Sequence, residues 1–370
     1  GPQPRPPVPA PQVLMTSAPA PSSPLPPVEQ VRPGLWSVPV PIPNNPLRYV
    51  FVYAFESDAG TYLVDAGWNT DESWETLCAG LRQAGTDISS VRGVLVTHIH
   101  PDHYGLAGRV RETSGSWVAL HPADAALIQD RYFDPESLLE RMAVSLRWMG
   151  APAEEVSPLA NAAMPVKMFV TTVQPDILLE DGDKPDVPGW DLSAIWTPGH
   201  SPGHLCFYEP RYQLMLSGDH VLPRITPNIP FHPQAGDDPL GAFLRSLERL
   251  ESYPSDEVLP AHEHRFVGLQ ARLAELAVHH EHRFGEVRAA LAGGCTTPWE
   301  VAERMEWSRP WSRINGFMRR AAVAEAMAHL RALERRGHIR SVESDGGPVR
   351  FELVEPSASA SANAGGGGAS

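Results

Sequence analysis

THIHPDHYG, residues 97–105, places three histidines and an aspartate within six consecutive positions. The stretch ends an apolar segment, 91–97, whose residues predict a short strand buried on both faces. Buried imidazoles each need a hydrogen-bond partner, and several protonated imidazoles close together would repel one another. On a loop at the end of a strand, the same side chains can converge on a metal ion. We therefore interpret HIHPDH, residues 98–103, as a metal-binding motif rather than an incidental histidine-rich loop.

Further potential metal ligands come directly after other predicted strands. They close the motifs TPGH, SGD and PAH, as His200, Asp219 and His262. Small residues beside each ligand would let the backbone turn sharply towards a shared centre. Asp65, in VDAG, also follows an early strand, and we expect it to brace the HIHPDH loop rather than to touch metal.

Together these motifs resemble the metallo-β-lactamase superfamily, in the branch that includes glyoxalase II and related metal-dependent hydrolases. The resemblance covers about residues 32–275, and the ligand motifs occur in the family's order. It implies an α+β fold, an αββα sandwich with two divalent metal ions at one edge of its sheets. The ions would be zinc, with iron or manganese as the alternatives known in the family. The resemblance assigns His98, His100 and His200 to the first metal, Asp102, His103 and His262 to the second, and Asp219 to a bridge between them.

This metal arrangement supports hydrolysis. Two divalent ions about 3.5–4 Å apart can share a bridging water and bring its pKa towards ~7. The resulting hydroxide would attack an activated carbonyl or a phosphorus, and Asp102 could orient it or pass a proton to the leaving group. The sequence offers no credible serine or cysteine triad. True β-lactamases of this fold usually lack a bridging aspartate, so Asp219 argues against antibiotic hydrolysis.

For several residues near the ligands, two alternative roles remain open. Tyr104 either donates a hydrogen bond to a transition-state oxyanion or packs in the core. His204 either supports a ligand from behind or is purely structural, and His220 either reaches the site or does not. Surface positions are expected for the remaining histidines of this part of the chain, His264, His279, His280 and His282.

The composition of the chain indicates which partners and which cellular compartment to expect. A formal net charge of −14 repels phosphate backbones overall, so a nucleic-acid partner is not expected unless a local basic patch reverses this. The three cysteines form no CxxC pair, which fits a reducing compartment. The sequence shows neither an apolar run of ~20 residues nor a signal-peptide pattern, so we expect a cytoplasmic protein without a membrane partner.

Four segments are expected. Residues 1–30 are Pro-rich and predicted to be disordered, 31–278 form the catalytic domain, 279–355 a small second domain, and 356–370 a flexible tail. In the catalytic domain, strands are predicted at 49–55, 61–64, 91–97, 192–197, 212–217 and 258–260. A helix is predicted at 71–84, with Asp71 as its N-cap.

A helical insertion is predicted at about 122–169. Its obvious anchors are Leu138, Leu139, Met142, Leu146, Trp148 and Met149. Two interpretations remain open. The insertion is either a helical layer that packs on the sheet or a cap whose Met and Trp side chains line an apolar substrate pocket.

The second domain reads as helix, helix, helix, hairpin. A Thr297-Pro298 start, a long helix at 321–336 and a hairpin at 339–353 give this order. It resembles the winged-helix domain appended to some enzymes of the superfamily, lactamase-beta-like protein 2 among them. Its basic residues, which invite a nucleic-acid interpretation, are Arg319, Arg320, Arg331, Arg335, Arg336 and Arg340. Solvated faces offset by Glu325 and Glu334 are the alternative, and homodimerisation or shaping of the substrate entrance are further roles.

We therefore expect a metal-dependent hydrolase of a thioester or related ester, with an apolar acyl group under the helical cap. A metal-dependent endoribonuclease of the lactamase-beta-like protein 2 type is the alternative, and a lactonase or a di-iron oxidative enzyme is a minor one. Glutathione recognition does not carry over, because the glyoxalase II region that supplies it is replaced here by the second domain. A non-catalytic module is disfavoured because the ligand set is complete.

Overall fold

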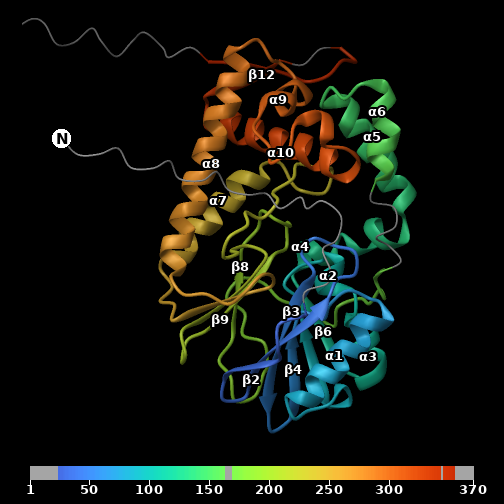
Figure 1. The fold of residues 1–370 in the computed structure, drawn as a ribbon, viewed down its shortest axis with the longest axis vertical. Coiled ribbons are helices and arrows are strands. Elements are labelled where there is room, and N and C mark those ends of the chain that lie inside the picture. Colours follow the sequence, from blue (N-terminus) through green and yellow to red (C-terminus); the bar gives the residue numbers. More distant parts are fainter. Residues whose placement is uncertain (1–23, 163–168, 343–344, 355–370) are drawn as a thin grey trace, which may run out of the picture.

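The computed structural model describes residues 24–162, 169–342 and 345–354. Two β-sheets form the lower part of the molecule in Figure 1, and a group of helices lies above one end of them. Most of the segment predicted to be disordered, the end of the helical insertion and the predicted flexible tail lie outside the described residues. Strand β1 begins at Glu29, which corrects the predicted end of the disordered segment at residue 30.

The first sheet has seven strands in sequence order. They are β1 Glu29–Arg32, β2 Leu35–Pro41, β3 Tyr49–Ser57, β4 Gly60–Val64, β5 Val91–Leu95, β6 Trp117–Leu120 and β7 Ile177–Leu178. Pairing is antiparallel from β1 to β4 and parallel from β4 to β7. Helices α1, Asp71–Gln83, and α3, Ala107–Ser114, share a buried apolar cluster with this sheet.

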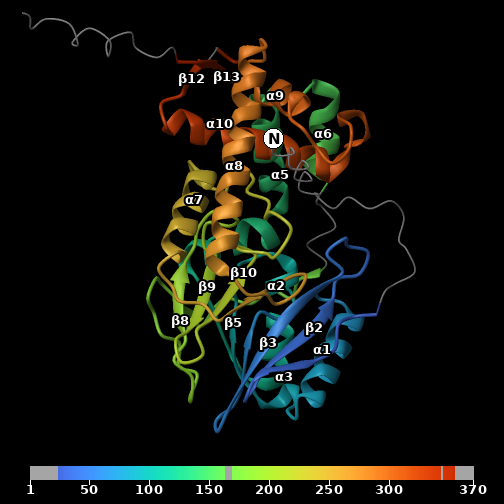
Figure 2. The ribbon, with the colours of Figure 1, turned by 60° about the vertical axis from the view of Figure 1, so that its left-hand side comes forward.

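The second sheet has four strands in the order β11-β10-β9-β8. They are β8 Ser193–Trp196, β9 Leu205–Glu209, β10 Leu214–Gly218 and β11 Glu257–Pro260. Only the β10–β11 pair is parallel. Helices α7, Pro239–Leu250, and α8, Leu269–Ala292, cover its outer face (Figure 2).

The two sheets pack face to face. Leu95, Phe207 and Leu216 belong to one buried cluster that joins them. Val94, the neighbour of Leu95 on β5, instead packs on the helical side of the first sheet. Because adjacent strand residues point to opposite faces, β5 is buried on both sides, as its apolar sequence predicts. The αββα sandwich is confirmed.

Short helical elements connect these layers. Helix α2, Pro101–Tyr104, follows the metal motif, and η1, Ile88–Ser90, precedes β5. The insertion contains α4 Pro122–Ala125, the π-helical turn η2 Gln129–Phe133, α5 Pro135–Trp148 and α6 Ala153–Asn161. Leu146 and Met149 of this insertion are buried against the C-terminal helices rather than against a sheet alone.

The C-terminal part consists of α8, α9 Pro298–Arg304, η4 Trp311–Arg313, α10 Gly316–Arg335 and the hairpin β12 Ile339–Val342 with β13 Arg350–Leu353. Helix α8 is continuous from Leu269 to Ala292 and therefore runs across the boundary predicted between residues 278 and 279. Phe243 of α7, Phe284 of α8 and Met327 of α10 belong to one buried cluster, so the C-terminal helices share a core with the helices of the second sheet. The winged-helix assignment of this part stays a prediction.

Two local details differ from expectation. Thr70, not Asp71, caps α1, because its side chain accepts the backbone N–H of Ser73 at 3.1 Å. The sequence does not predict β6 or β9, whose four and five residues are almost wholly buried and therefore lack polar alternation. In the part of the chain that the structure describes, no helix combines the length and apolarity needed to span a bilayer.

Candidate metal centre

The HIHPDH loop leaves the C-terminal end of β5 and is held there by Asp65. The Asp65 carboxylate accepts hydrogen bonds from the Thr97 backbone N–H at 2.8 Å and from the Thr97 hydroxyl at 3.0 Å. Asp65 itself has a φ of 65°, a left-handed conformation that Asp tolerates better than most residues. The bracing role predicted for Asp65 is therefore supported by two hydrogen bonds to the start of the loop.

The first group of candidate ligands gathers His98, His100 and His200. His98 Nε2 lies 3.0 Å from His100 Nδ1, and His200 Nε2 lies 3.3 Å from Asp219 Oδ2. His98 Nε2 is 3.8 Å from the same oxygen. The ligand atoms of these side chains thus face one another across a small volume.

The second group gathers Asp102, His103, Asp219 and His262. Asp102 Oδ2 lies 3.3 Å from His103 Nε2 and 3.1 Å from His262 Nε2. Asp219 Oδ1 lies 3.4 Å and 3.2 Å from the same two nitrogens. Asp219 therefore directs one carboxylate oxygen at each group, which is the arrangement expected of a bridging ligand.

The spacing of these atoms fits divalent cations. Nitrogen and oxygen ligands at about 2.0–2.2 Å from a tetrahedral ion lie roughly 3.3 Å from one another. Several of the inward-facing atoms are buried and have no hydrogen-bond partner among the described residues, namely His103 Nε2, His200 Nε2, His262 Nε2 and Asp219 Oδ1. Unpaired buried polar atoms are costly, and a cation at each group would satisfy them.

The outer nitrogens of the histidines are fixed from behind. His103 Nδ1 donates to Asp65 at 2.7 Å, His200 Nδ1 to the Asn228 carbonyl at 2.7 Å and His262 Nδ1 to the Tyr49 carbonyl at 2.9 Å. In the neutral ring these bonds select the tautomer whose Nε2 carries the lone pair, which is the state needed for a metal ligand. Thr97 Oγ1 similarly accepts from His98 Nδ1 at 3.0 Å.

The surroundings of the two groups shift the pKa values of His98 and His100 and the pKa of His262 in opposite directions. Burial, and then the neighbouring imidazoles, hold the pKa of His98 and that of His100 well below the ordinary value. Burial acts in the same direction on His262, but Asp219 and Asp102 overcome it and raise its pKa to about 10. Two carboxylates beside the second group therefore provide the negative charge that a divalent cation would neutralise.

Gly218 explains how Asp219 reaches the centre. It has a φ of 51°, and a Cβ there would lie 2.6 Å from His204 Nε2. Any side chain at residue 218 would therefore push the His204 ring away from the turn that ends β10. His204 Nε2 accepts the backbone N–H of Asp219 at 3.1 Å, while its Nδ1 donates to Thr197 Oγ1 at 2.8 Å. His204 thus supports the bridging residue through the backbone.

Tyr104 and His220 belong to neither group of candidate ligands. The Tyr104 hydroxyl exchanges hydrogen bonds with the backbone of Val173, so it has no donor left for an oxyanion. His220 is fully buried, and its ring packs edge-on to Phe243 at 4.8 Å. The structural roles of both residues are therefore favoured.

Asp124 is a site residue that the sequence does not predict. Its Oδ2 accepts the backbone N–H of Ile99 and the Ser201 hydroxyl, each at 2.8 Å, and its Oδ1 accepts the Gly203 N–H at 2.6 Å. Asp124 thereby ties the loop of His98 and His100 to the loop of His200. Its position in HPADA, with no histidine-rich context nearby, offers no local pattern that would reveal this role.

The remaining histidines are only partly on the surface. His264 and His282 are exposed and His279 is half-buried, but His280 is buried in the helical core, which corrects its expected surface position. His280 Nδ1 lies 3.1 Å from His329 Nε2 of α10. The burial follows from the packing of α8 against α10, which the local sequence does not report.

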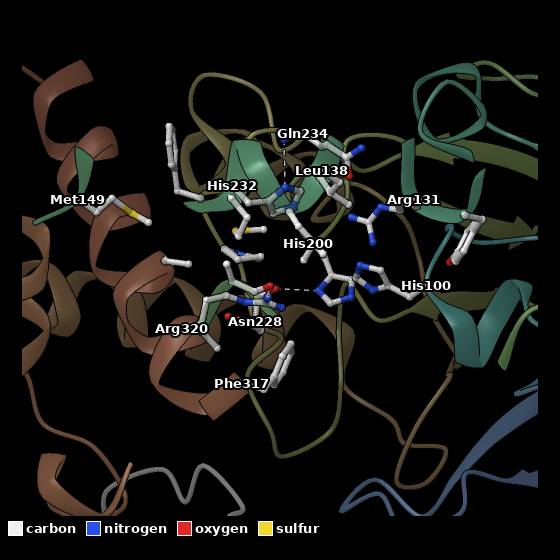
Figure 3. A pocket seen from close by; sticks show the side chains of 18 residues that line it. His100, Arg131, Leu138, Met149, His200, Asn228, His232, Gln234, Phe317 and Arg320 are labelled. Atoms are coloured by element: carbon white, nitrogen blue, oxygen red, sulfur yellow. Dashed lines mark hydrogen bonds between the residues drawn. The ribbon is translucent and has the colours of Figure 1, made fainter. Parts of the chain in front are cut away.

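A cavity of about 240 Å³ opens from His100 and His200. The helical insertion contributes Leu138, Leu139, Met142 and Met149 to its wall, and α10 contributes Phe317, Arg320, Ala321 and Ala324. Figure 3 shows the side chains that line the cavity together with the two histidines, and a dashed line marks the His200–Asn228 bond. The insertion and the C-terminal helices therefore enclose the space next to the first ligand group.

Fold and site together define the class of a metallo-hydrolase. A sequence model described as the metallo-beta-lactamase superfamily matches residues 45–262, and the chain belongs to this superfamily. It is similar to the probable metallo-hydrolase YqjP of Bacillus subtilis, with 28% identity over 69% of this chain and 80% of that protein.

A solved structure extends the likeness beyond the sandwich. A metallo-beta-lactamase family protein from Thermus thermophilus has 30% identity and a TM-score of 0.75, over 88% of this chain and 100% of that chain. Human acyl-coenzyme A thioesterase MBLAC2 is 27% identical over 46% of this chain and 56% of its own length.

Proposed function

We propose that this metallo-hydrolase cleaves a thioester or a related activated ester. The observation that carries the proposal is the cavity that joins His100 and His200 to the apolar side chains of the insertion. An acyl chain in this cavity would place its carbonyl beside the first ligand group. Burial of apolar surface supplies about 25 cal/mol per Å², so Leu138, Met142 and Met149 would favour such a chain.

The chain's own residues support this chemistry. We propose His98, His100 and His200 as ligands of one ion, Asp102, His103 and His262 as ligands of a second, and Asp219 as the bridge. When bound, such ions lower the pKa of a shared water and polarise a carbonyl oxygen. Burial opposes ionisation of Asp102, but His103 and His262 hold its pKa well below the usual range. Asp102 is therefore ionised at neutral pH, and we propose that it orients the attacking water or passes a proton to the leaving group.

The comparisons favour the same substrate class. The similarity to a protein named acyl-coenzyme A thioesterase motivates a thioester, although it covers only part of either chain. The alternative of a ribonuclease has less support, because five of the six basic residues named for the C-terminal part form ion pairs within the chain. Arg319 pairs with Glu155, Arg336 with Glu281, Arg335 with Asp237, Arg331 with Glu334 and Arg340 with Glu352.

The test is thiol release from acyl-coenzyme A thioesters of increasing chain length, measured on protein with a known metal content. We expect turnover by the unmodified protein and a loss on the order of 100-fold or more in Asp219→Ala, because Asp219 faces both ligand groups. Asp58→Ala, in the exposed turn between β3 and β4, is the matched control and should retain activity. No turnover of any thioester or ester by protein that carries both ions would contradict the proposal.

A further inference from the structure

Two arginine side chains face the cavity from opposite parts of the chain. Arg131 lies on the π-helical turn η2, and Arg320 lies on α10. Figure 3 shows Arg131 above His100 and Arg320 on the side of α10. π-Helical turns are rare and are found frequently at functional sites. The cavity therefore holds two cationic groups beside the first ligand group.

These arginines lack carboxylate partners. Within the described residues, neither side chain forms an ion pair, and Arg131 Nε is buried without a hydrogen-bond partner. In the same part of the chain, Arg320 donates only to the Leu159 and Ala160 carbonyls, both at 3.3 Å. Nearby Asp130 is already engaged, because it pairs with Arg141 at 2.7 Å. None of the described residues that line the cavity is acidic.

The other polar groups of the cavity add donors. His232 Nδ1 accepts the Gln234 backbone N–H at 3.1 Å, so its proton lies on Nε2. Burial, and then Arg131 and Arg320, lower the pKa of His232 to about 3, which keeps the ring neutral. Burial and Arg131 likewise lower the pKa of Arg320 to about 10. Two partly desolvated guanidinium groups that repel each other would both be stabilised by an anion.

We propose that Arg131 and Arg320 form an anion subsite that selects substrates carrying a carboxylate or a phosphate near the scissile ester. This proposal rests on the proposed function and names its substrate class more closely. The carbonyl would lie beside His100 and His200, the methylene groups against Leu139 and Met142, and the anion between the guanidinium groups. A cavity of about 240 Å³ suits a short acyl chain, since pockets for drug-sized ligands begin at about 300 Å³.

The kinetic test compares matched substrates. The glutaryl thioester of N-acetylcysteamine has a terminal carboxylate, and its carboxamide analogue has the same shape without the charge. We expect kcat/KM for the glutaryl substrate to exceed that for the analogue about 10- to 100-fold, the range for a charge-assisted hydrogen bond. Arg131→Gln and Arg320→Gln should remove most of this ratio. Arg147→Gln, an exposed arginine on α5, is the control that should change neither rate.

A second arm locates the anion. The carboxamide substrate is presented on N-acetylcysteamine and on 4′-phosphopantetheine. A preference for the phosphopantetheine thioester that Arg131→Gln abolishes would assign the subsite to a phosphate on the thiol side. A preference only for the glutaryl acyl group would assign it to a carboxylate on the acyl side. Equal rates in both comparisons would overturn the anion subsite and leave the proposed hydrolase intact.

Binding separates this inference from catalysis. We expect glutarate to bind the metal-loaded protein in calorimetry, and the double variant Arg131→Gln/Arg320→Gln to bind it at least 10-fold more weakly. The double variant Arg131→Lys/Arg320→Lys keeps both charges. It should bind glutarate more weakly than the unmodified protein and more tightly than the Gln double variant. If no ester is hydrolysed but this ranking holds, the subsite stands and the proposed reaction falls. Glutarate binding that is equal in all variants belongs to the metals and overturns the subsite.

Discussion

At the scale of single residues, two carboxylates that are not candidate ligands hold the ligand loops in place. Asp65 and Asp124 both accept backbone N–H groups of the HIHPDH segment, at Thr97 and Ile99 respectively. Only Asp124 also reaches the loop of His200, through Ser201 and Gly203. It therefore sets the distance between loops that come from different sheets.

Asp124→Ala should weaken metal binding by about 10- to 100-fold, the range seen when the support behind a ligand is lost. The change leaves two backbone N–H groups and a hydroxyl without their acceptor, so the loops of His98 and His200 can separate. Competition with a chelator, with metal content as the readout, measures the effect. Asp58→Ala is again the control, and an unchanged affinity in Asp124→Ala would refute this positioning role.

At the scale of elements, α8 and α10 meet through a pair of buried imidazoles. His329 Nδ1 donates to the Glu325 carbonyl at 2.8 Å, so His329 Nε2 accepts from His280 Nδ1. Burial and the neighbouring His329 hold the pKa of His280 well below the ordinary value, and burial lowers that of His329 to about 3. The pair is therefore neutral in the folded protein.

This pair should make folding sensitive to acid. Below about pH 6.5 the unfolded chain binds protons on both histidines, and the folded chain does not. The free energy of unfolding should therefore fall as the pH falls from about 6.5 towards 5, by about 1.4 kcal/mol per pH unit for each histidine. Chemical denaturation of His280→Leu/His329→Leu should show a correspondingly smaller slope. Phe284→Leu perturbs the same core without a titrating group and should keep the slope; an equal slope in the double variant would contradict the prediction.

Element boundaries also show where sequence patterns stop being informative. Strands β3, β4 and β5 are predicted to within two residues at each end, because β-branched and aromatic runs end at turn residues. The predicted boundary at 278/279 lies inside α8, because this helix continues from the second sheet to α10 without any interruption of its helical sequence. Residues such as Leu276 and Phe284 lie on one helix and in one core.

At the scale of the whole molecule, the C-terminal helices contribute one wall of the cavity next to the candidate metal centre. Helix α10 supplies Phe317 and Arg320 to the wall, and the core of Phe243 and Met327 continues into the catalytic part. All candidate ligands of the two groups precede residue 263, so α10 adds its wall to the cavity from beyond the segment that holds the centre.

A chain that ends at residue 293 should therefore lose stability and substrate selection together. The truncation exposes the faces of α7 and α8 that pack on α10 and removes one wall of the cavity. We expect a fall in Tm of more than about 10 °C, since each large core side chain left exposed costs about 1.5–3 kcal/mol. A chain that ends at Val354 keeps all described elements and is the control. An unchanged Tm and acyl preference in the shorter chain would show that the C-terminal part is independent.

The sequence by itself determined the superfamily, the αββα sandwich and the set of candidate metal ligands, because each ligand follows a strand within a short motif. Local periodicity and turn residues report on such neighbours along the chain. Only the tertiary structure decided that Asp124 joins two ligand loops, that His280 is buried, and that Arg131 and Arg320 face one cavity. These relations join residues distant along the chain, and they depend on how helices pack, which no local pattern specifies.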